Sequence, residues 1–473
     1  MIDSIINWLN MFDDFLYYPV LIIVLAAAGV YFSLRSRFAQ IRLCSDAVRI
    51  LSEHPAGLGG VSPIDALMVS TASIVGTGNI IGVSTAICLG GPGAVFWMWV
   101  MAILGGASSL IESTLAQIFK QKDPETERSY GGPAYYIEAV IHSKPLAVMF
   151  SLFLIATYGF GFNALASYNL QSTFAVYDFY NPKVTPLIIG AVIALLVGWC
   201  LLGGAMRIVN IAGFLVPLMI TMYIATSLMI ILMHINKLPE VLRMIFSDAF
   251  NFRAIGSGIA GSCLVYGIKR GLYSNEAGVG AAPNAAAYAN TQHPVKQGII
   301  QMLSVYIDTI LICTATAFLC LISGVPSSPQ SAGAQYVQAS MMAVFGEFGP
   351  VFITAIMVLF AFTTLLGNLF YVDNALVYLN GKRMPSKKFM MVFRVVCALV
   401  ILAGAALPMS MVWAVADITM AGMTLLNIPV LMIGGGIVFR AIKDYEKQRR
   451  AGVDPVFRAS EIGLDPERLS YWQ

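Results

Sequence analysis

The chain alternates between long apolar runs and short polar connections along nearly its whole length. A run of about 20 apolar residues can cross a bilayer as one helix. On this basis the pattern predicts eleven membrane-spanning helices and an all-α polytopic membrane protein. The predicted spans are residues 17–34, 64–90, 93–119, 147–175, 184–203, 208–235, 254–280, 297–323, 350–378, 389–407 and 411–439.

The composition supports this class. Apolar residues make up 58% of the chain, charged residues 11%, and the mean hydropathy is +0.77, which lies outside the range of soluble proteins. The sequence contains no HExxH or GxSxG motif and no paired acid and base. We therefore expect no enzyme activity, no cofactor and no nucleic-acid partner, with the lipid bilayer as the surroundings.

The distribution of lysine and arginine predicts the orientation in the membrane. The segment 35–49 after the first helix carries four arginines, and basic connections stay on the cytoplasmic side. The N-terminus is therefore expected outside, the C-terminus inside, and the protein in the cytoplasmic (inner) cell membrane. Only a few basic residues then fall outside, namely Lys183, Lys237, Arg243 and Arg253.

Two of the predicted helices are interrupted by glycine and polar residues. They are the second helix (64–90) and the seventh (254–280), and they enter the membrane from opposite sides. Two five-helix units of opposite topology are typical of inverted-repeat secondary transporters. We expect one transmembrane transporter domain over 1–473. Its parts would be an extra helix at 17–34, repeat 1 at 64–235, repeat 2 at 254–439 and a cytoplasmic tail at 440–473.

The strongest local signal is the sequence Gly76-Thr77-Gly78-Asn79 in the middle of the second helix. Glycine is a poor helix former, and a broken helix in lipid needs protein or a polar cavity to satisfy its backbone. The freed N–H groups can hold a carboxylate, and the freed carbonyls can coordinate a small cation. The alternative is close helix packing by small residues. No GxxxxGK[ST] phosphate loop is present.

The seventh helix contains Tyr266 to Gly278, with three glycines, a Lys-Arg pair and Ser-Asn-Glu. Ionisable groups in a membrane segment usually pair or line a cavity. One interpretation places the break of a second discontinuous helix at Gly267-Ile268, with Glu276 paired to Arg270 or Lys269. The other ends the helix near Ile268 and makes the remainder a cytoplasmic loop.

The ninth helix carries the adjacent hydroxyls Thr363 and Thr364, followed by Asn368. Such hydroxyls often bond to carbonyls one turn earlier, but they can also offer neutral oxygens to sodium. Four further carboxylates lie in predicted spans and could act in coupling or gating, or form satisfied structural pairs. They are Glu112, Asp308, Asp373 and Asp417.

Taken together, these motifs resemble the alanine/glycine:cation symporter family. The similar stretches are 76–82, 90–99 with Glu112, 270–271, 274–278, Pro283, 307–309, 313–315 and 360–364. The resemblance covers nearly the whole chain. It implies a LeuT-like five-plus-five fold with one extra N-terminal helix, and sodium-coupled uptake of a small neutral amino acid such as alanine or glycine.

The resemblance also implies roles for individual residues. The substrate carboxylate would be held by Thr77, Gly78 and Asn79. The amino group and side chain would lie against Gly267 and Ile268, and the pocket would be completed by Leu165, Ala166, Thr364 and Asn368. Sodium, the co-transported ion, would bind the carbonyls of Val75 and Gly76 and the hydroxyls of Thr363 and Thr364.

Two positions depart from the family pattern. Ala166 stands where many members carry a glutamine that faces the pocket, and a bulky tryptophan common near Asn368 is missing. Both changes enlarge the pocket and remove a hydrogen-bond partner, so a larger substrate such as glutamine also fits the prediction.

The predicted function is therefore sodium and amino-acid symport by alternating access. One rival is a proton-coupled amino-acid transporter that uses Glu112, Asp308 or Glu276 as a relay. The other is a sensor that binds an amino acid without moving it.

Overall fold

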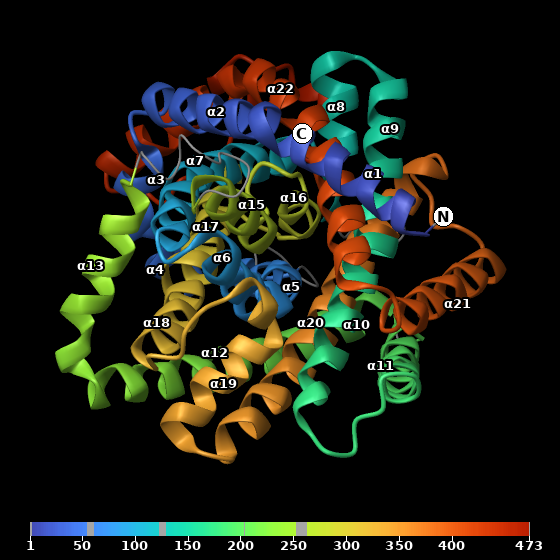
Figure 1. Cartoon of the computed structure of the whole chain (residues 1–473). Helices are drawn as coiled ribbons and strands as arrows, with labels where there is room; N and C mark the ends of the chain where they lie inside the picture. Colours follow the sequence, from blue (N-terminus) through green and yellow to red (C-terminus); the bar gives the residue numbers. More distant parts are fainter. Residues whose placement is uncertain (1, 54–60, 123–128, 203, 252–262, 473) are drawn as a thin grey trace.

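A computed structural model describes residues 2–53, 61–122, 129–202, 204–251 and 263–472 (Figure 1). The described chain is almost entirely helical. The helices of the first half are α1 (Ile2–Phe15), α2 (Ile22–Arg35), α3 (Ala39–Arg42), α4 (Cys44–Leu51), α5 (Pro63–Ile74), α6 (Val83–Gly90), α7 (Ala94–Ile118), α8 (Pro133–Ile141), α9 (Lys144–Leu154), α10 (Phe162–Ser172), α11 (Thr185–Leu201), α12 (Gly204–Met233) and α13 (Leu238–Ala249). Those of the second half are α15 (Cys263–Asn275), α16 (Ala282–Ala286), α17 (Pro294–Val305), α18 (Thr314–Ile322), α19 (Ala334–Phe345), α20 (Phe348–Leu379), α21 (Lys387–Gly404) and α22 (Met409–Arg450).

Short π-helical segments join several of these helices into longer spans. They are η1 (Leu16–Leu21), η2 (Gly78–Gly82), η3 (Ile155–Gly161) and η7 (Tyr306–Cys313). Single 3₁₀ turns occur at Thr173–Val176, Ile235–Lys237, Pro329–Ser331, Ala459–Ile462 and Pro466–Arg468. Two short antiparallel strands, β1 (Gln121–Lys122) and β2 (Ser129–Tyr130), pair at the end of α7.

Seven helical spans of the described chain are long and apolar enough to cross a membrane. The bent pair formed by Pro63–Ile74 and Gly78–Gly90 makes an eighth, and the helix Thr185–Leu201 is apolar but shorter. These spans coincide with predicted ones, so the chain is a multi-pass membrane protein. The count of eleven and the inverted repeat remain predictions. The first part of the predicted span 254–280, up to residue 262, lies outside the described residues.

The spans differ in how much of their apolar surface is buried inside the protein. In α20 and α7, 72% and 67% of the most apolar window is buried, against 28% in the window of α12 and 33% in that of the first span. Figure 1 shows α5, α6, α15 and α16 in the middle of the molecule, with α2, α11, α12 and α21 outside them. The broken second helix therefore lies in the protein interior, where protein groups can satisfy its backbone.

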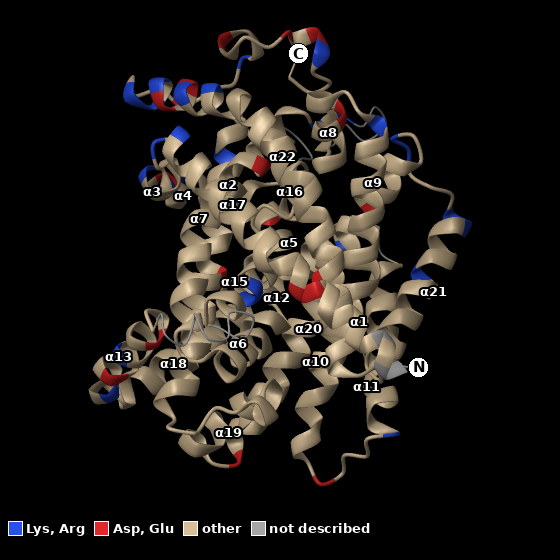
Figure 2. Ribbon diagram, turned by 45° about the horizontal axis from the view of Figure 1, so that its top comes forward, with Lys and Arg blue, Asp and Glu red and all other residues tan. Residues whose placement is uncertain are grey.

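Charged residues are concentrated near the ends of the molecule. Figure 2 shows many of them around α3, α4 and the C-terminal part of α22, and a second group on α13. The helix α22 continues to Arg450, beyond the predicted end of the last span at residue 439. Its final turns therefore form a basic helical extension of the last predicted span.

Local sequence explains where the broken helix begins. Ser62 Oγ accepts a hydrogen bond from Asp65 N at 3.1 Å, and Asp65 Oδ2 accepts one from Ser62 N at 3.3 Å. This reciprocal cap is followed by Pro63 at the first helical position, which suits its fixed φ and missing N–H.

Candidate functional site

The second predicted helix is interrupted where the glycine pair indicates. α5 ends at Ile74, Val75 is extended with φ −77° and ψ 95°, and the axis bends by 51° before the helix resumes at Gly78. Asn79 closes the break, because its Oδ1 accepts a hydrogen bond from Gly76 N at 2.8 Å. The break is a built structure with a specific cap rather than a simple kink.

Close approach of neighbouring side chains explains both glycines. A Cβ at Gly76 would lie 2.0 Å from Thr364 Oγ1, and a Cβ at Gly78 would lie 2.5 Å from Tyr273 Cε1. Thr364 belongs to α20 and Tyr273 to α15, so a larger residue at either position would push a neighbouring helix away. The glycines thus serve the break and close packing together.

The two adjacent threonines of α20 have different surroundings. The buried hydroxyl of Thr364 faces Gly76 and has no hydrogen-bond partner in the described structure. The hydroxyl of Thr363 bonds to the carbonyls of Leu359 at 3.0 Å and Phe360 at 3.1 Å, and lies 3.4 Å from Met219 Sδ on α12. Of the four residues expected at sodium, the structure brings together Val75, Gly76 and Thr364, whereas the Thr363 hydroxyl lies toward α12.

A chain of hydrogen bonds between one hydroxyl and two side-chain amides links α20 to α5 and α10 beside the break. Ser73 Oγ donates to Asn368 Oδ1 at 2.7 Å, and Asn368 Nδ2 donates to Asn163 Oδ1 at 3.0 Å. Neither Ser73 nor Asn163 was among the predicted site residues. Ser73 lies just before the glycine pair, and Asn163 lies just before the predicted Leu165 and Ala166, so sequence position alone could have indicated both.

α10 also reaches the break itself. Asn169 Nδ2 donates to Thr77 Oγ1 at 3.0 Å, and Asn169 Oδ1 is buried without a partner among the described residues. Ala166 and Leu165 precede Asn169 by three and four residues and therefore share its face of the helix. Both are fully buried. The structure thus places them on the face of α10 that points to Thr77.

A buried carboxylate contacts the break from the other side. Asn79 Nδ2 donates to Asp308 Oδ1 and, at 3.1 Å, to Ser274 Oγ. Ser274 Oγ donates to Asp308 Oδ2 at 2.7 Å. Asp308 is fully buried, and no lysine or arginine of the described ranges lies within ion-pair distance of it. The Asn79 amide is therefore occupied within the protein, and an uncompensated carboxylate lies next to it.

The interpretations of the seventh helix need correction. α15 runs without interruption from Cys263 to Asn275, so the predicted break at Gly267-Ile268 is wrong, and so is a helix end at Ile268. Gly267 instead allows α15 to pack on α7, since a Cβ there would lie 2.5 Å from the carbonyl oxygen of Ala94 and 2.6 Å from Trp97 Cβ. Ile268 is buried beside it.

The predicted pairing of Glu276 with Arg270 or Lys269 is also wrong. Lys269 pairs with Asp13 of α1 and lies 3.5 Å from Asp417 of α22, while Arg270 Nη2 bonds Asp417 Oδ2 at 2.9 Å. These partners come from elements distant in sequence. Figure 2 shows basic residues of α15 in the middle of the molecule. The cluster ties α15 to α1 and α22 inside the membrane region.

Two further carboxylates of the membrane spans, Glu112 and Asp373, have protein partners. Glu112 accepts from Gly278 N at 3.2 Å and from Asn427 Nδ2 at 3.0 Å. Asp373 bonds Arg394 at 3.5 Å. Among the carboxylates considered from the sequence, Asp308 is the one hydrogen-bonded to the helix break. No group of three or more His, Cys, Asp or Glu side chains that could hold a metal occurs in the described part of the chain.

Comparison with known protein families shows the family to which this chain belongs. The model of the sodium:alanine symporter family matches residues 2–459. The chain belongs to that family. Among curated members, it is 39% identical over 447 residues to "Probable sodium/glutamine symporter GlnT" of Bacillus subtilis, covering 94% of this chain and 91% of the relative. It is 35% identical over 458 residues to "Sodium/alanine symporter AgcS" of Methanococcus maripaludis, covering 94% and 98%.

A solved structure supports the fold of this sodium:alanine symporter family member. MhsT, crystallised in complex with L-phenylalanine, superposes with a TM-score of 0.58 over 87% of this chain and 92% of that one, at 15% identity. At this identity the likeness shows the fold alone. The fold of this solved structure therefore agrees with the family affiliation.

Proposed function

We propose that this chain is a sodium-coupled symporter that imports a small neutral amino acid by alternating access. The observation that carries the proposal is the junction of Gly76 and Thr364, where a broken helix meets a buried hydroxyl without a partner. Relatives named as sodium/glutamine and sodium/alanine symporters support the substrate class. The N-terminus would lie outside the cell membrane and the C-terminus in the cytoplasm, as the arginines after α2 indicate.

The proposed cation site uses neutral oxygens from two elements. The carbonyls of Val75 and Gly76 come from the break, and the hydroxyl of Thr364 comes from α20. Oxygen ligands of this kind suit a hard cation. Thr363 was predicted as a fourth ligand, but its hydroxyl lies toward Met219 of α12, whereas that of Thr364 faces Gly76. We therefore assign the larger contribution to cation binding to the hydroxyl of Thr364.

The proposed substrate site lies on the other side of the same break. The first N–H groups of a helix have no intrahelical partner and carry partial positive charge, so Thr77 and Gly78 would hold the substrate carboxylate. Asn79 would position the break through its bonds to Gly76 and Asp308. Asn368, with Ala166 and Leu165 of α10, would limit the pocket. The role expected for Gly267 and Ile268 is not carried over, because α15 is continuous there and Gly267 packs on α7.

Coupling would follow from the position of the sodium ion. An ion held by both the break and α20 would fix these elements against each other and so assemble the substrate site. The two ligands would then raise each other's affinity by the same factor. A small residue at position 166 in place of glutamine would favour a substrate side chain larger than that of alanine. The relative GlnT is named a probable sodium/glutamine symporter, so we propose glutamine as the larger substrate to test.

Proton coupling is the second candidate, and one observation favours it. Asp308 is a buried carboxylate without a basic partner in the described chain, and it bonds directly to Asn79. A proton or a cation could neutralise it. Sodium remains the first proposal, because the unpartnered Thr364 hydroxyl offers an oxygen ligand but cannot carry a titrating charge at neutral pH.

The test is equilibrium binding of alanine and glutamine to the purified full-length protein at increasing sodium concentration. We expect amino-acid affinity to rise with sodium, and Thr364→Ala to shift the sodium titration to higher concentration. Thr363→Ala is the matched control on the neighbouring position and should shift it far less. Affinity that is independent of sodium but changes with pH would replace the sodium proposal with proton coupling.

A further inference from the structure

A large groove lies outside the proposed transport site, between the C-terminal end of α2 and the last turns of α22. Its cavity measures about 860 Å³. Seven basic side chains and one carboxylate line it, together with a small apolar floor. The basic residues are Arg35, Arg37, Arg42, Arg440, Lys443, Lys447 and Arg450.

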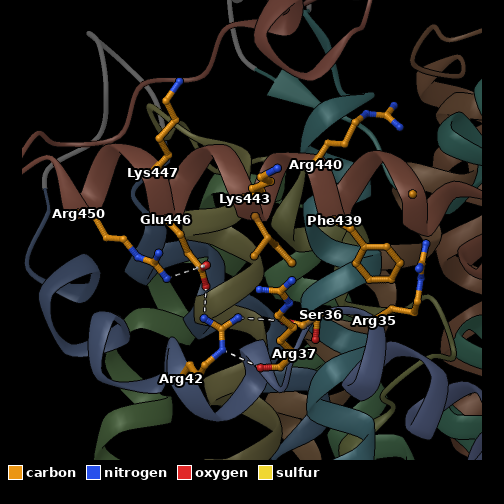
Figure 3. Close-up of a pocket in the computed structure, with 12 residues that line it drawn as sticks. Arg35, Ser36, Arg37, Arg42, Phe439, Arg440, Lys443, Glu446, Lys447 and Arg450 are labelled. Carbon is orange, nitrogen blue, oxygen red and sulfur yellow. Dashed lines mark hydrogen bonds and ion pairs between the residues drawn. The ribbon is translucent and has the colours of Figure 1, made fainter.

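The one carboxylate does not neutralise the groove. Glu446 pairs with Arg42 and lies 3.9 Å from Arg450. Arg35, Arg37 and Lys443 are exposed, and none of them has a carboxylate partner among the described residues. Figure 3 shows Arg42 reaching Glu446 across the groove. An excess of positive charge therefore remains on the walls.

The basic groove is suited to an anion, and its location next to the first membrane span indicates which kind. Arg35 is the last residue of the first membrane span, and its guanidinium lies 5.7 Å from the ring centroid of Phe439 on α22 (Figure 3). Directly before it on α2, Leu34 is 61% exposed, and Ile433 on α22 is 65% exposed. Ile433 shares a helix face with the groove residue Gly436. An exposed apolar side chain therefore lies near the basic groove on each of the two helices.

This combination matches an anionic phospholipid. The arginine fork suits bidentate contacts with phosphate oxygens, and acyl chains would follow the exposed apolar faces of α2 and α22. Basic pockets between transmembrane helices on the cytoplasmic side are a recognised way to bind lipid headgroups. We propose that this groove binds the phosphate headgroup of an anionic phospholipid from the adjacent leaflet, and thereby joins α2 to α22.

The test measures binding of phosphatidylglycerol and phosphatidylcholine to the fluorescently labelled full-length protein in detergent. Wild type should bind phosphatidylglycerol far more tightly than phosphatidylcholine. Each basic group near a membrane surface contributes roughly a fivefold gain in affinity. The triple variant Arg35→Gln, Arg37→Gln, Lys443→Gln should therefore lose roughly 100-fold.

Two controls keep the result interpretable. The variant Lys387→Gln, Lys388→Gln removes exposed charges at the start of α21, outside the groove, and should bind phosphatidylglycerol as wild type does. Arg35→Lys with Arg37→Lys retains the charge and should retain most of the binding. Thermal unfolding of the triple variant at the wild-type temperature excludes misfolding as the cause of its loss.

Three outcomes would overturn the proposal. Equal affinity for the two lipids would exclude selection by charge. An equal loss in the α21 control would show that the groove is not the site. Displacement of the lipid by millimolar inorganic phosphate or glycerol 1-phosphate alone would show that the groove binds a soluble anion.

Discussion

A methyl group at Gly76 tests the junction between the helix break and α20. The Cβ of Gly76→Ala would lie 2.0 Å from Thr364 Oγ1 and 3.2 Å from Thr364 Cβ. The first contact is far shorter than two atoms can sustain, so the break and α20 must separate. Overpacking of this kind costs about 1–3 kcal/mol of folding free energy. The melting temperature of the purified protein should fall accordingly.

The same displacement removes the Thr364 hydroxyl from the carbonyls of Val75 and Gly76. A neutral oxygen bonded to a charged group contributes about 1.5–3 kcal/mol. The sodium concentration for half-maximal amino-acid binding should therefore rise roughly ten- to hundredfold. The assay is amino-acid binding to the detergent-purified variant over a sodium titration, with thermal unfolding measured on the same samples.

Second substitutions at Thr364 separate packing from sodium binding. Gly76→Ala with Thr364→Ala removes the clashing oxygen, so thermal stability should recover while sodium affinity stays low. Thr364→Val alone replaces the hydroxyl with a methyl and should weaken sodium binding with Gly76 intact. If Gly76→Ala has wild-type stability and a wild-type sodium titration, the proposed junction is refuted.

Three further predictions follow from the charged groups. Asp308→Asn keeps the shape of the side chain but removes its charge, so coupling should weaken. The stimulation of uptake by the coupling ion should fall at least tenfold. An unchanged ion titration would show that Asp308 has a structural role only. Asp417→Asn leaves Arg270 without a full negative partner and should destabilise the protein by about 3–5 kcal/mol in thermal unfolding, whereas adding Arg270→Met should recover much of that loss; equal stability of both variants would contradict this. Burial raises the pKa of Asp454, but hydrogen bonds and the charge of Lys296 outweigh it and hold that pKa below the usual range. This stabilisation is complete above the unfolded pKa of about 4 and is lost as pH falls through the lower folded value, so the C-terminal tail should become protease-sensitive only in strong acid, and Asp454→Asn should make it sensitive at neutral pH.

The membrane spans could be predicted because the bilayer sets the length of an apolar run, and this signal is local in sequence. The break at Gly76 was equally readable, since two glycines and an asparagine stand together in the middle of a predicted membrane helix. Gly267 shows the limit of the same rule. It is a glycine in a polar stretch, but it serves close packing on Ala94 within a continuous helix.

Partners across the fold could not be read from the chain. Lys269 and Asp13 are 256 residues apart, and Asn79 and Asp308 are 229 apart. Glu276 is nearer in sequence to Lys269 and Arg270, but these two residues pair with the buried carboxylates of α1 and α22 instead. The two threonines illustrate a finer limit, because each step along a helix turns the side chain by about 100°. Only the packing of α20 shows that Thr364, and not Thr363, faces the break.

Transport by the purified protein in liposomes distinguishes sodium-coupled symport from proton coupling and from binding without transport. The measurement is uptake of labelled alanine and glutamine under an inward sodium gradient, with membrane potential and pH held equal on both sides. We expect accumulation above equilibrium only with the sodium gradient, together with amino-acid-stimulated entry of labelled sodium. Accumulation driven by a pH gradient without sodium, or saturable binding with no accumulation under any gradient, would contradict it.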